Sequence, residues 1–247
     1  GLGASFTLCA SAAALALWWP VARGAAGFMP QWRRRPQRAL FVRSLAVGAV
    51  ASTLALIGNL SLMLVTAQLG RFGPAAVAAF GIAARLEFLV VPVAFGVGSA
   101  ATAMVGRAVG AGDWARARQV AWMSGAIAFV IAGSLGLVVA LAPRAAAGLF
   151  TSDAAVADIA AQALRWTGYS FGLFGLGMAL YFASLGAGRL KVPALAAVTR
   201  LALAAGLGGW LAQTHGPDGL FIGVALGAAA YGLINAAGVR PGLWKAR

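Results

Sequence analysis

The stretch that decides the fold is Met104-Val105-Gly106-Arg107-Ala108-Val109-Gly110-Ala111-Gly112-Asp113-Trp114-Ala115-Arg116-Ala117-Arg118, which lies between two long apolar segments. Its glycines are typical of a helix end, and Asp113 is positioned to cap the helix that follows. Three arginines are expected at a membrane surface, because charged side chains are costly inside a bilayer. The stretch therefore predicts a junction between two membrane-spanning helices.

The composition extends this interpretation to the whole chain. Hydrophobic residues make up 62% of the 247 residues, and charged residues make up only 10%. Apolar runs of about 20 residues, which cross a bilayer of roughly 30 Å, recur along the sequence, whereas the alternating pattern of barrel strands does not. We predict an all-α membrane protein with seven transmembrane helices. The predicted spans are residues 3–22, 44–69, 75–106, 117–142, 159–186, 192–212 and 217–239.

The positive charge is explained by its placement. A net charge of +14 would indicate a nucleic-acid partner for a soluble protein, but basic residues of bacterial membrane proteins gather in cytoplasmic loops. When the longest polar segment, residues 23–43, is placed inside, fourteen of the nineteen Lys and Arg fall on the inner side. We therefore exclude nucleic acid, expect membrane lipid around the protein, and predict a multi-pass protein of the bacterial cytoplasmic (inner) membrane with a cytoplasmic linker and C-terminus.

The same count predicts how the chain is divided. An odd number of spans puts the N-terminus outside, and no initiating Met or basic segment of a secretory signal precedes the first span. We interpret residues 1–22 as the last transmembrane helix of an otherwise missing first lobe and residues 23–43 as a basic cytoplasmic linker. Residues 44–247 are then a six-helix lobe with a short cytoplasmic tail. A genuine seven-helix protein is the alternative.

Ionisable residues at membrane depth are the first functional candidates. Glu87 lies about 18 Å along a helix that starts near Ala75, which places it near the bilayer midplane. It is expected either to exchange a proton or attract a cationic substrate, or to pair with an arginine on another helix. Arg85 is two residues away and does not face it. Arg200 is predicted to extend its stem toward water at the inner end of its span, with cavity lining as the less favoured alternative.

A polar stripe on the second span supplies further candidates. Ser52, Asn59 and Thr66 recur every seven residues and lie on nearly one helix face. The stripe is expected to line a cavity or, alternatively, to serve helix packing, because Ser and Thr also bond to their own backbone. Pro92 is expected to kink the third span or to be tolerated there. Glycines at four-residue spacing predict close helix contacts. They are Gly106 and Gly110, Gly168 and Gly172, and Gly219, Gly223 and Gly227.

The residue types present do not indicate an enzyme. The chain has one histidine, His215, and one cysteine, Cys9, which cannot form a zinc site or a Cys and His dyad. Phosphate-binding glycine motifs are also absent. We therefore expect no catalytic residue, no metal and no cofactor.

Three blocks of the sequence resemble the multidrug and toxic compound extrusion (MATE) transporters. The first is Val77-Ala78-Ala79-Phe80-Gly81-Ile82-Ala83-Ala84-Arg85-Leu86-Glu87. The second runs from Pro92 to Arg118, and the third is Tyr181-Phe182-Ala183-Ser184-Leu185-Gly186-Ala187-Gly188 with Pro193 and Arg200. The family typically has Val-Gly-Gln-x-x-Gly-Ala in the second block, where this chain has Val105-Gly106-Arg107 followed by Gly110-Ala111.

The resemblance implies a twelve-helix transporter built from two six-helix lobes, of which residues 44–239 form the second. It implies efflux of small organic, often cationic, compounds by alternating access, with a proton or sodium gradient as the energy source. The acidic residues of sodium-coupled members align with Gly58 or Asn59 and with Leu176 or Gly177, so sodium binding at that position is not expected. With Tyr181 from the third block, the polar residues named above are the candidates for the substrate and cation pathway.

Other functions remain open at this point. A related flippase for lipid-linked saccharides would need a strongly cationic central cavity. A noncatalytic seven-helix membrane subunit would show no transport. A photoreceptor would need a lysine deep in the last helix, and the only lysines, Lys191 and Lys245, lie at membrane edges.

Overall fold

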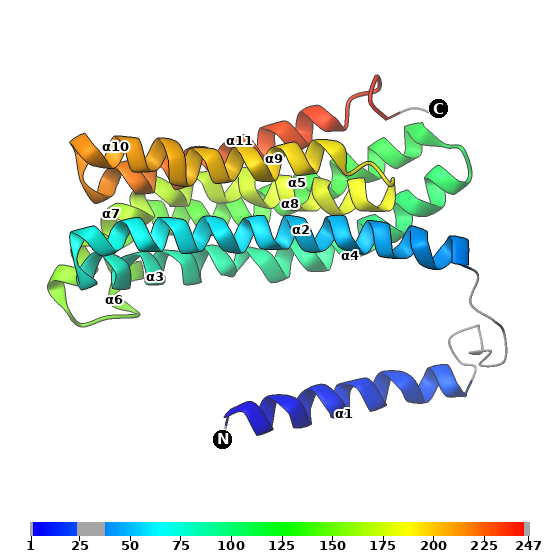
Figure 1. Cartoon of the computed structure of the whole chain (residues 1–247), viewed down its shortest axis with the longest axis horizontal. Coiled ribbons are helices and arrows are strands. Elements are labelled where there is room, and N and C mark those ends of the chain that lie inside the picture. The colour runs from blue at the N-terminus through cyan, green and yellow to red at the C-terminus, as the bar shows by residue number, and fades with distance from the viewer. Residues whose placement is uncertain (1, 24–37, 245–247) are drawn as a thin grey trace. The chain divides into compact units, whose positions relative to one another are not determined.

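The computed structural model describes residues 2–23 and 38–244, and the elements in these ranges are all helices (Figure 1). The chain divides into two units, Gly1–Ala46 and Val47–Arg247. The first unit contains α1 (Leu2–Ala22), an apolar helix of 21 residues that matches the first predicted span. The guanidinium of Arg23 lies 4.0 Å from the ring centroid of Trp19 at the end of this helix. The rest of the predicted linker lies mostly outside the described residues.

The second unit contains the helices that form the lobe, some of which are pieces of one longer helix. They are α2 (Arg38–Leu69, which begins in the first unit), η1 (Gly70–Phe72), α3 (Pro74–Phe88), α4 (Val90–Gly110), α5 (Trp114–Leu141), α6 (Pro143–Gly148), α7 (Ala154–Thr167), η2 (Gly168–Ser170), α8 (Phe171–Gly186), α9 (Lys191–Leu201), η3 (Ala202–Leu207), α10 (Gly208–His215) and α11 (Pro217–Gly238).

Joined where they continue, these pieces give six segments of the described chain that are long and apolar enough to cross a membrane. They correspond to the second to seventh predicted spans. Several boundaries differ by three to five residues. The largest difference is in α2, which begins at Arg38, six residues before the predicted start of its span, so the end of the predicted linker is helical. The segments are Gly48–Phe72, Pro74–Gly110, Trp114–Leu141, Ala154–Gly186, Lys191–His215 and Pro217–Gly238.

The junction between α4 and α5 has the structure that its sequence predicts. Helix α4 ends at Gly110, and Gly112 has φ +78°, a conformation that glycine adopts without steric cost. The Asp113 carboxylate accepts a 2.8 Å hydrogen bond from the backbone N–H of Arg116, which caps α5. Arg118 donates a 2.9 Å hydrogen bond to the carbonyl oxygen of Trp244. The junction therefore also anchors the segment after α11.

Helix α8 lies at the centre of the lobe and packs on α4, α5 and α11. Glycine makes these contacts close, because a Cβ on Gly186 would meet the backbone of Thr102 in α4, and a Cβ on Gly232 of α11 would meet that of Leu173. The predicted glycine contacts are present with one exception: nothing lies within 4 Å of the Cβ position of Gly110. Those in contact are Gly106, Gly168, Gly172, Gly219, Gly223 and Gly227.

Two of the spans are interrupted. The third is broken between α3 and α4 at Leu89, three residues before Pro92, as expected from the missing N–H and the bulk of the proline ring. The sixth contains η3, a π-helical segment of six residues that begins two residues after Arg200. The apolar run predicts a helix here but not its π-helical form. The carbonyl oxygen of Ala205, inside it, accepts a 3.1 Å hydrogen bond from Gln68 of α2.

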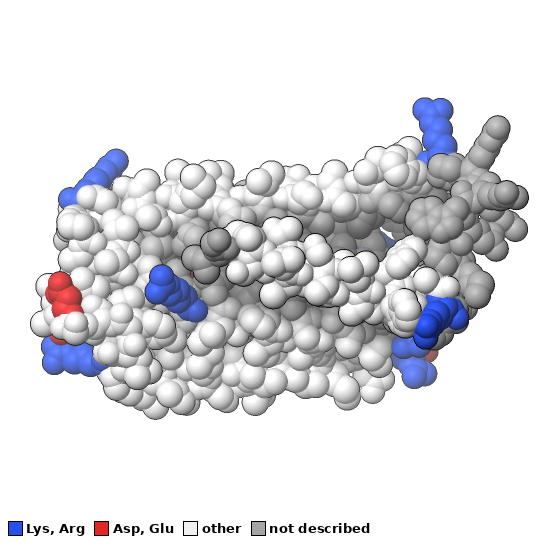
Figure 2. All heavy atoms as spheres, turned by 90° about the horizontal axis from the view of Figure 1, so that it is seen from below, with Lys and Arg blue, Asp and Glu red and all other residues white. Residues whose placement is uncertain are grey.

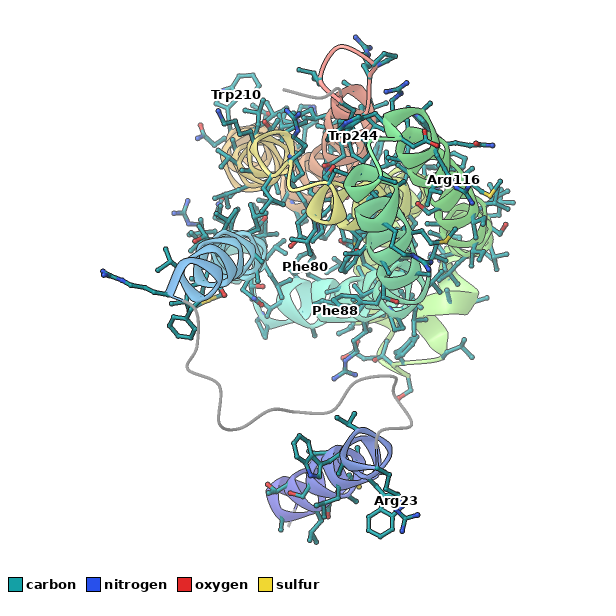
Figure 3. The ribbon with its side chains drawn as sticks, turned by 90° about the vertical axis from the view of Figure 1, so that its right-hand side faces the viewer. Arg23, Phe80, Phe88, Arg116, Trp210 and Trp244 are labelled. Atoms are coloured by element: carbon teal, nitrogen blue, oxygen red, sulfur yellow. The ribbon has the colours of Figure 1, made fainter. Side chains whose placement is uncertain are left out.

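Charge and apolar surface are separated along the helices. Most of the charged side chains visible in Figure 2 lie near the two ends. Large apolar side chains such as Leu56 and Met63 on α2 are 68% exposed, as expected for surface facing lipid or another transmembrane helix. Viewed along the helices, Phe80 of α3 points into the space beside α2, whereas Trp210 of α10 points outward (Figure 3). Phe80 is one of the residues that line the candidate site.

Candidate functional site

The candidate site is a cavity of about 390 Å³ within the lobe. Helices α2, α3, α4, α8, α9 and α11 supply its walls, and most of its lining is apolar. A second cavity of about 380 Å³ shares part of this lining, including Phe95, Phe174 and Arg200, so the two form adjoining chambers. An apolar cavity between several helices with a few polar side chains in its wall is the usual setting of a small-molecule site.

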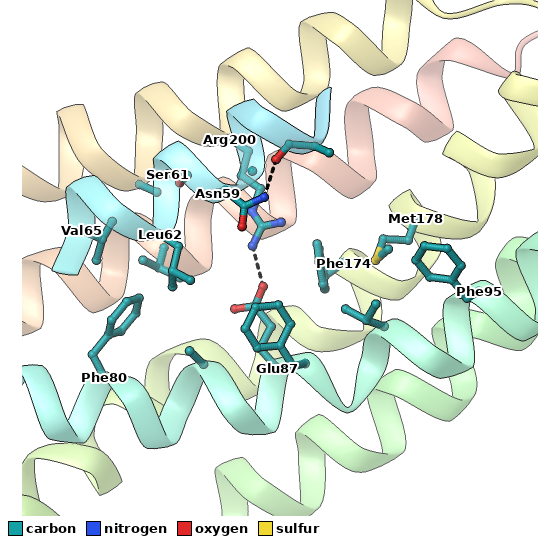
Figure 4. A pocket seen from close by; sticks show the side chains of 17 residues that line it. Asn59, Ser61, Leu62, Val65, Phe80, Glu87, Phe95, Phe174, Met178 and Arg200 are labelled. Carbon is teal, nitrogen blue, oxygen red and sulfur yellow. Dashed lines mark hydrogen bonds and ion pairs between the residues drawn. The ribbon is translucent and has the colours of Figure 1, made fainter. Parts of the chain in front are cut away.

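Glu87 and Arg200 meet in the first chamber (Figure 4). Glu87 lies in the last turn of α3, and its Oε1 is 2.5 Å from Nη2 of Arg200 on α9. The side chains are only 17% and 23% exposed, respectively. The ion pair with an arginine on another helix, which the sequence allowed as one of two alternatives for Glu87, is therefore present. The prediction that Arg200 extends toward water is wrong, because a buried carboxylate is the stronger partner for its guanidinium.

Arg200 has further contacts that fix its position. Its Cζ lies 4.3 Å from the ring centroid of Phe174, a cation–π geometry. Gly227 of α11 faces its stem, since a Cβ there would lie 2.8 Å from the carbonyl oxygen of Arg200 and 3.4 Å from its Cγ. The arginine is therefore held by a carboxylate, an aromatic ring and a close helix contact.

The polar stripe on α2 does not act as one surface. Asn59 lines the first chamber, and its Nδ2 donates a 2.9 Å hydrogen bond to the carbonyl oxygen of Ala55. Thr66 donates a 2.8 Å hydrogen bond to the carbonyl oxygen of Leu62. Neither Ser52 nor Thr66 lines the chambers. A strict seven-residue repeat drifts around a straight helix, so the two ends of the stripe face different surroundings.

The remaining two candidates differ in their placement. Arg85 is exposed and does not line either chamber, in agreement with the expectation that it does not face Glu87. Tyr181 of α8 lines the second chamber, where its ring centroid lies 5.3 Å from that of Phe182. The structure thus brings Glu87, Asn59, Arg200 and Tyr181 to the adjoining chambers.

Most of the aromatic lining of the chambers was not among the residues predicted from the sequence. Phe95 and Phe182 are 4.7 Å apart between ring centroids, and Phe174 and Tyr231 are 6.0 Å apart. Together with Tyr181 these four rings border the second chamber. Aromatic residues are frequent in any transmembrane helix, so only the position of Phe95 two turns after Glu87 could have indicated a shared face.

Charged residues at the far end of the lobe form a separate, solvent-accessible group. Asp158 and Arg144 pair at 2.8 Å, with side chains 57% and 79% exposed. Asp153 caps α7 by accepting hydrogen bonds from the backbone N–H groups of Ala155 and Val156. These residues form a water-exposed helix end rather than a binding site.

Comparison with known proteins identifies the family. The MatE family model matches residues 49–210. The "Probable multidrug resistance protein NorM" of Xanthomonas campestris pv. campestris is 32% identical over 177 residues, which cover 70% of this chain and 39% of that protein. A protein of the same name from Rhodopseudomonas palustris is 33% identical over 163 residues, covering 63% of this chain and 34% of its own length.

Solved structures agree over almost the whole chain. The Vibrio cholerae MATE transporter VcmN in the bent form is similar with a TM-score of 0.79 at 25% identity, covering 97% of this chain and 56% of that one. A MATE structure in the straight conformation has a TM-score of 0.84 at 21% identity, covering 96% and 54%, and supports the fold. The chain spans less than half the length of these curated relatives and just over half of these structures. This chain belongs to the MatE family of membrane transporters.

Proposed function

We propose that this chain is the C-terminal lobe, preceded by the last helix of the N-terminal lobe, of a multidrug efflux transporter. The complete protein exports small organic, often cationic, compounds by antiport with protons or sodium ions, and alternates between inward-open and outward-open states. Family membership and the names of the NorM relatives support this proposal. The transporter has no cofactor and draws its energy from an ion gradient.

The observation that carries the proposal is the Glu87–Arg200 pair inside an apolar cavity. An ionisable pair at membrane depth is costly, and such pairs mark substrate or ion pathways in transporters. The chamber of about 390 Å³ has room for a small organic molecule beside the pair. Asn59 in this chamber and Tyr181 in the second offer polar contacts along the same route.

The proposed orientation follows from the basic residues. Arg107, Arg116, Arg189 and Lys191 lie at or next to the ends of α4, α5, α8 and α9 that share one end of the lobe (Figure 1). Because basic residues gather on the cytoplasmic side, we place this end and the C-terminus in the cytoplasm of a bacterial cell. The transporter then lies in the cytoplasmic membrane.

Transport by the full-length protein that contains this chain tests the proposal. It is reconstituted in vesicles, and efflux of a fluorescent organic cation is followed with a proton gradient or a sodium gradient imposed separately. We expect efflux to respond to at least one gradient. The absence of a response to both gradients would refute the antiport mechanism.

The role of Glu87 is tested in the same vesicles with Glu87→Gln, which keeps the size of the side chain and removes its charge. We expect gradient-driven efflux to fall at least tenfold. Arg85→Gln is the matched control, because Arg85 belongs to the same helix and does not line the cavity. Unchanged transport and unchanged pH dependence of Glu87→Gln would show that the carboxylate is structural.

A further inference from the structure

The two adjoining chambers contain a single carboxylate among their described lining residues. Among the described residues that line the two chambers, Glu87 is the only acidic side chain. Its Oε1 contacts Nη2 of Arg200 at 2.5 Å. A positively charged group that entered the chambers would therefore find the one carboxylate already engaged by a cation of the protein itself.

The guanidinium is well suited to remain there. It is weakly hydrated compared with an ammonium group or a small metal ion and stacks on aromatic faces, and the ring of Phe174 lies 4.3 Å from its Cζ. Gly227 leaves room for its stem. The position is fixed by the backbone of α9, so the guanidinium pays no translational entropy to bind, unlike an ion from solution.

The groups around the guanidinium have the chemistry of a site for a hard cation. Figure 4 shows Asn59 and Arg200 side by side above Glu87. The amide nitrogen of Asn59 is used by the carbonyl of Ala55, which leaves the amide oxygen as the group that can contact a cation. A carboxylate and an amide oxygen are oxygen ligands of the kind that hard cations prefer.

We propose that Arg200 is a tethered cation whose guanidinium occupies the position beside Glu87 and excludes alkali metal ions, and that its removal lets a sodium ion bind at Glu87, next to Asn59. The inference deepens the proposed function and rests on it only for the role of this cavity in transport. In this proposal the cation that neutralises Glu87 is the guanidinium of Arg200, so a coupling sodium ion would have to bind elsewhere.

The test is the binding of radioactive sodium to the purified full-length protein, measured by equilibrium dialysis. Arg200→Gln is expected to gain a sodium site that binds at least tenfold more tightly than any Glu87-dependent site in the wild type. The double variant Glu87→Gln/Arg200→Gln is expected to lose this gain. Arg200→Lys, which keeps a tethered positive charge, and Arg85→Gln, which removes an arginine outside the cavity, are expected to bind sodium as the wild type does.

Two results would overturn the proposal: no gain of sodium binding in folded Arg200→Gln, or a gain that persists in the double variant. If Arg200→Gln does not fold, the comparison of wild type with Glu87→Gln decides. The proposal requires their sodium isotherms to superimpose, and sodium binding that depends on Glu87 in the wild type refutes it. Because the readout is equilibrium binding, a failure of gradient-driven efflux leaves this result unaffected, and active efflux does not rescue a negative one.

Discussion

The junction at residues 104–118 and the Glu87–Arg200 pair are two ways in which this chain handles charge. At the junction, the carboxylate is satisfied by its neighbours in sequence, because Asp113 caps the helix that contains Arg116. In the cavity, the partners are 113 residues apart and shielded by helices. A charged residue at a helix end indicates which side of the membrane that end faces, and we expect its substitution to have a small effect. The charged pair in the cavity depends on the packing of the whole lobe.

The largest effect is expected from breaking the cavity pair. Removing one partner of a buried ion pair costs about 3–5 kcal/mol, because the other charge is left without compensation. Since both side chains retain some exposure, we expect Arg200→Gln to lower the unfolding free energy by about 2–3 kcal/mol. The measurement is unfolding by denaturing detergent in mixed micelles. Glu87→Gln/Arg200→Gln should recover part of the loss, and strictly additive losses would contradict a direct interaction.

A smaller effect is expected from crowding the stem of Arg200. A methyl group at Gly227 would approach the backbone and Cγ of Arg200, and overpacking of this kind costs about 1–3 kcal/mol. Gly227→Ala is therefore expected to lower both thermal stability and gradient-driven efflux. Gly110→Ala is the control, because nothing lies within 4 Å of that position at the end of α4. Equal effects of the two changes would show that the cavity is no more constrained than the junction.

The junction itself is expected to respond weakly. Asp113→Ala removes the side-chain cap of α5 and should cost about 1 kcal/mol in unfolding free energy. We expect efflux by this variant to equal that of the wild type once the amount of folded protein is matched. Asp113→Asn, which retains a capping oxygen, should be close to wild type in stability. A tenfold loss of efflux in Asp113→Ala would mean that the junction takes part in transport.

The smallest effect is expected at the exposed pair of Arg144 and Asp158. An ion pair in water contributes about 0–1 kcal/mol, and both side chains are more than half exposed. Arg144→Gln should change the thermal unfolding temperature by no more than a degree or two. Its effect should also shrink with added salt, which screens exposed charges. A loss as large as that of Arg200→Gln would remove the distinction between the two kinds of pair.

The fold was largely predictable because its signals are local. Apolar runs predicted the spans, Asp113 marked the start of α5, and Pro92 lies three residues after the interruption at Leu89. The cavity was only partly predictable. Glu87 was identified by the cost of its charge in a membrane, but the partner on α9 depends on how the helices are rotated and stacked, which periodicity alone does not define. For the same reason, the orientation of Arg200 was predicted wrongly and most of the aromatic lining was not predicted.

The π-helical segment Ala202–Leu207 has a consequence for how this lobe tolerates insertions and deletions. A π-turn accommodates one residue more than an α-turn, so the segment acts as an insertion absorbed within a continuous helix. One residue corresponds to about 100° of rotation in an α-helix. Deleting a single residue there would therefore let the helix become regular while Arg200 kept its direction toward Glu87 and α10 kept its packing on α11. Regularising the segment without a deletion would instead rotate Arg200 relative to α10. The π-turn thus keeps the two halves of the helix in phase.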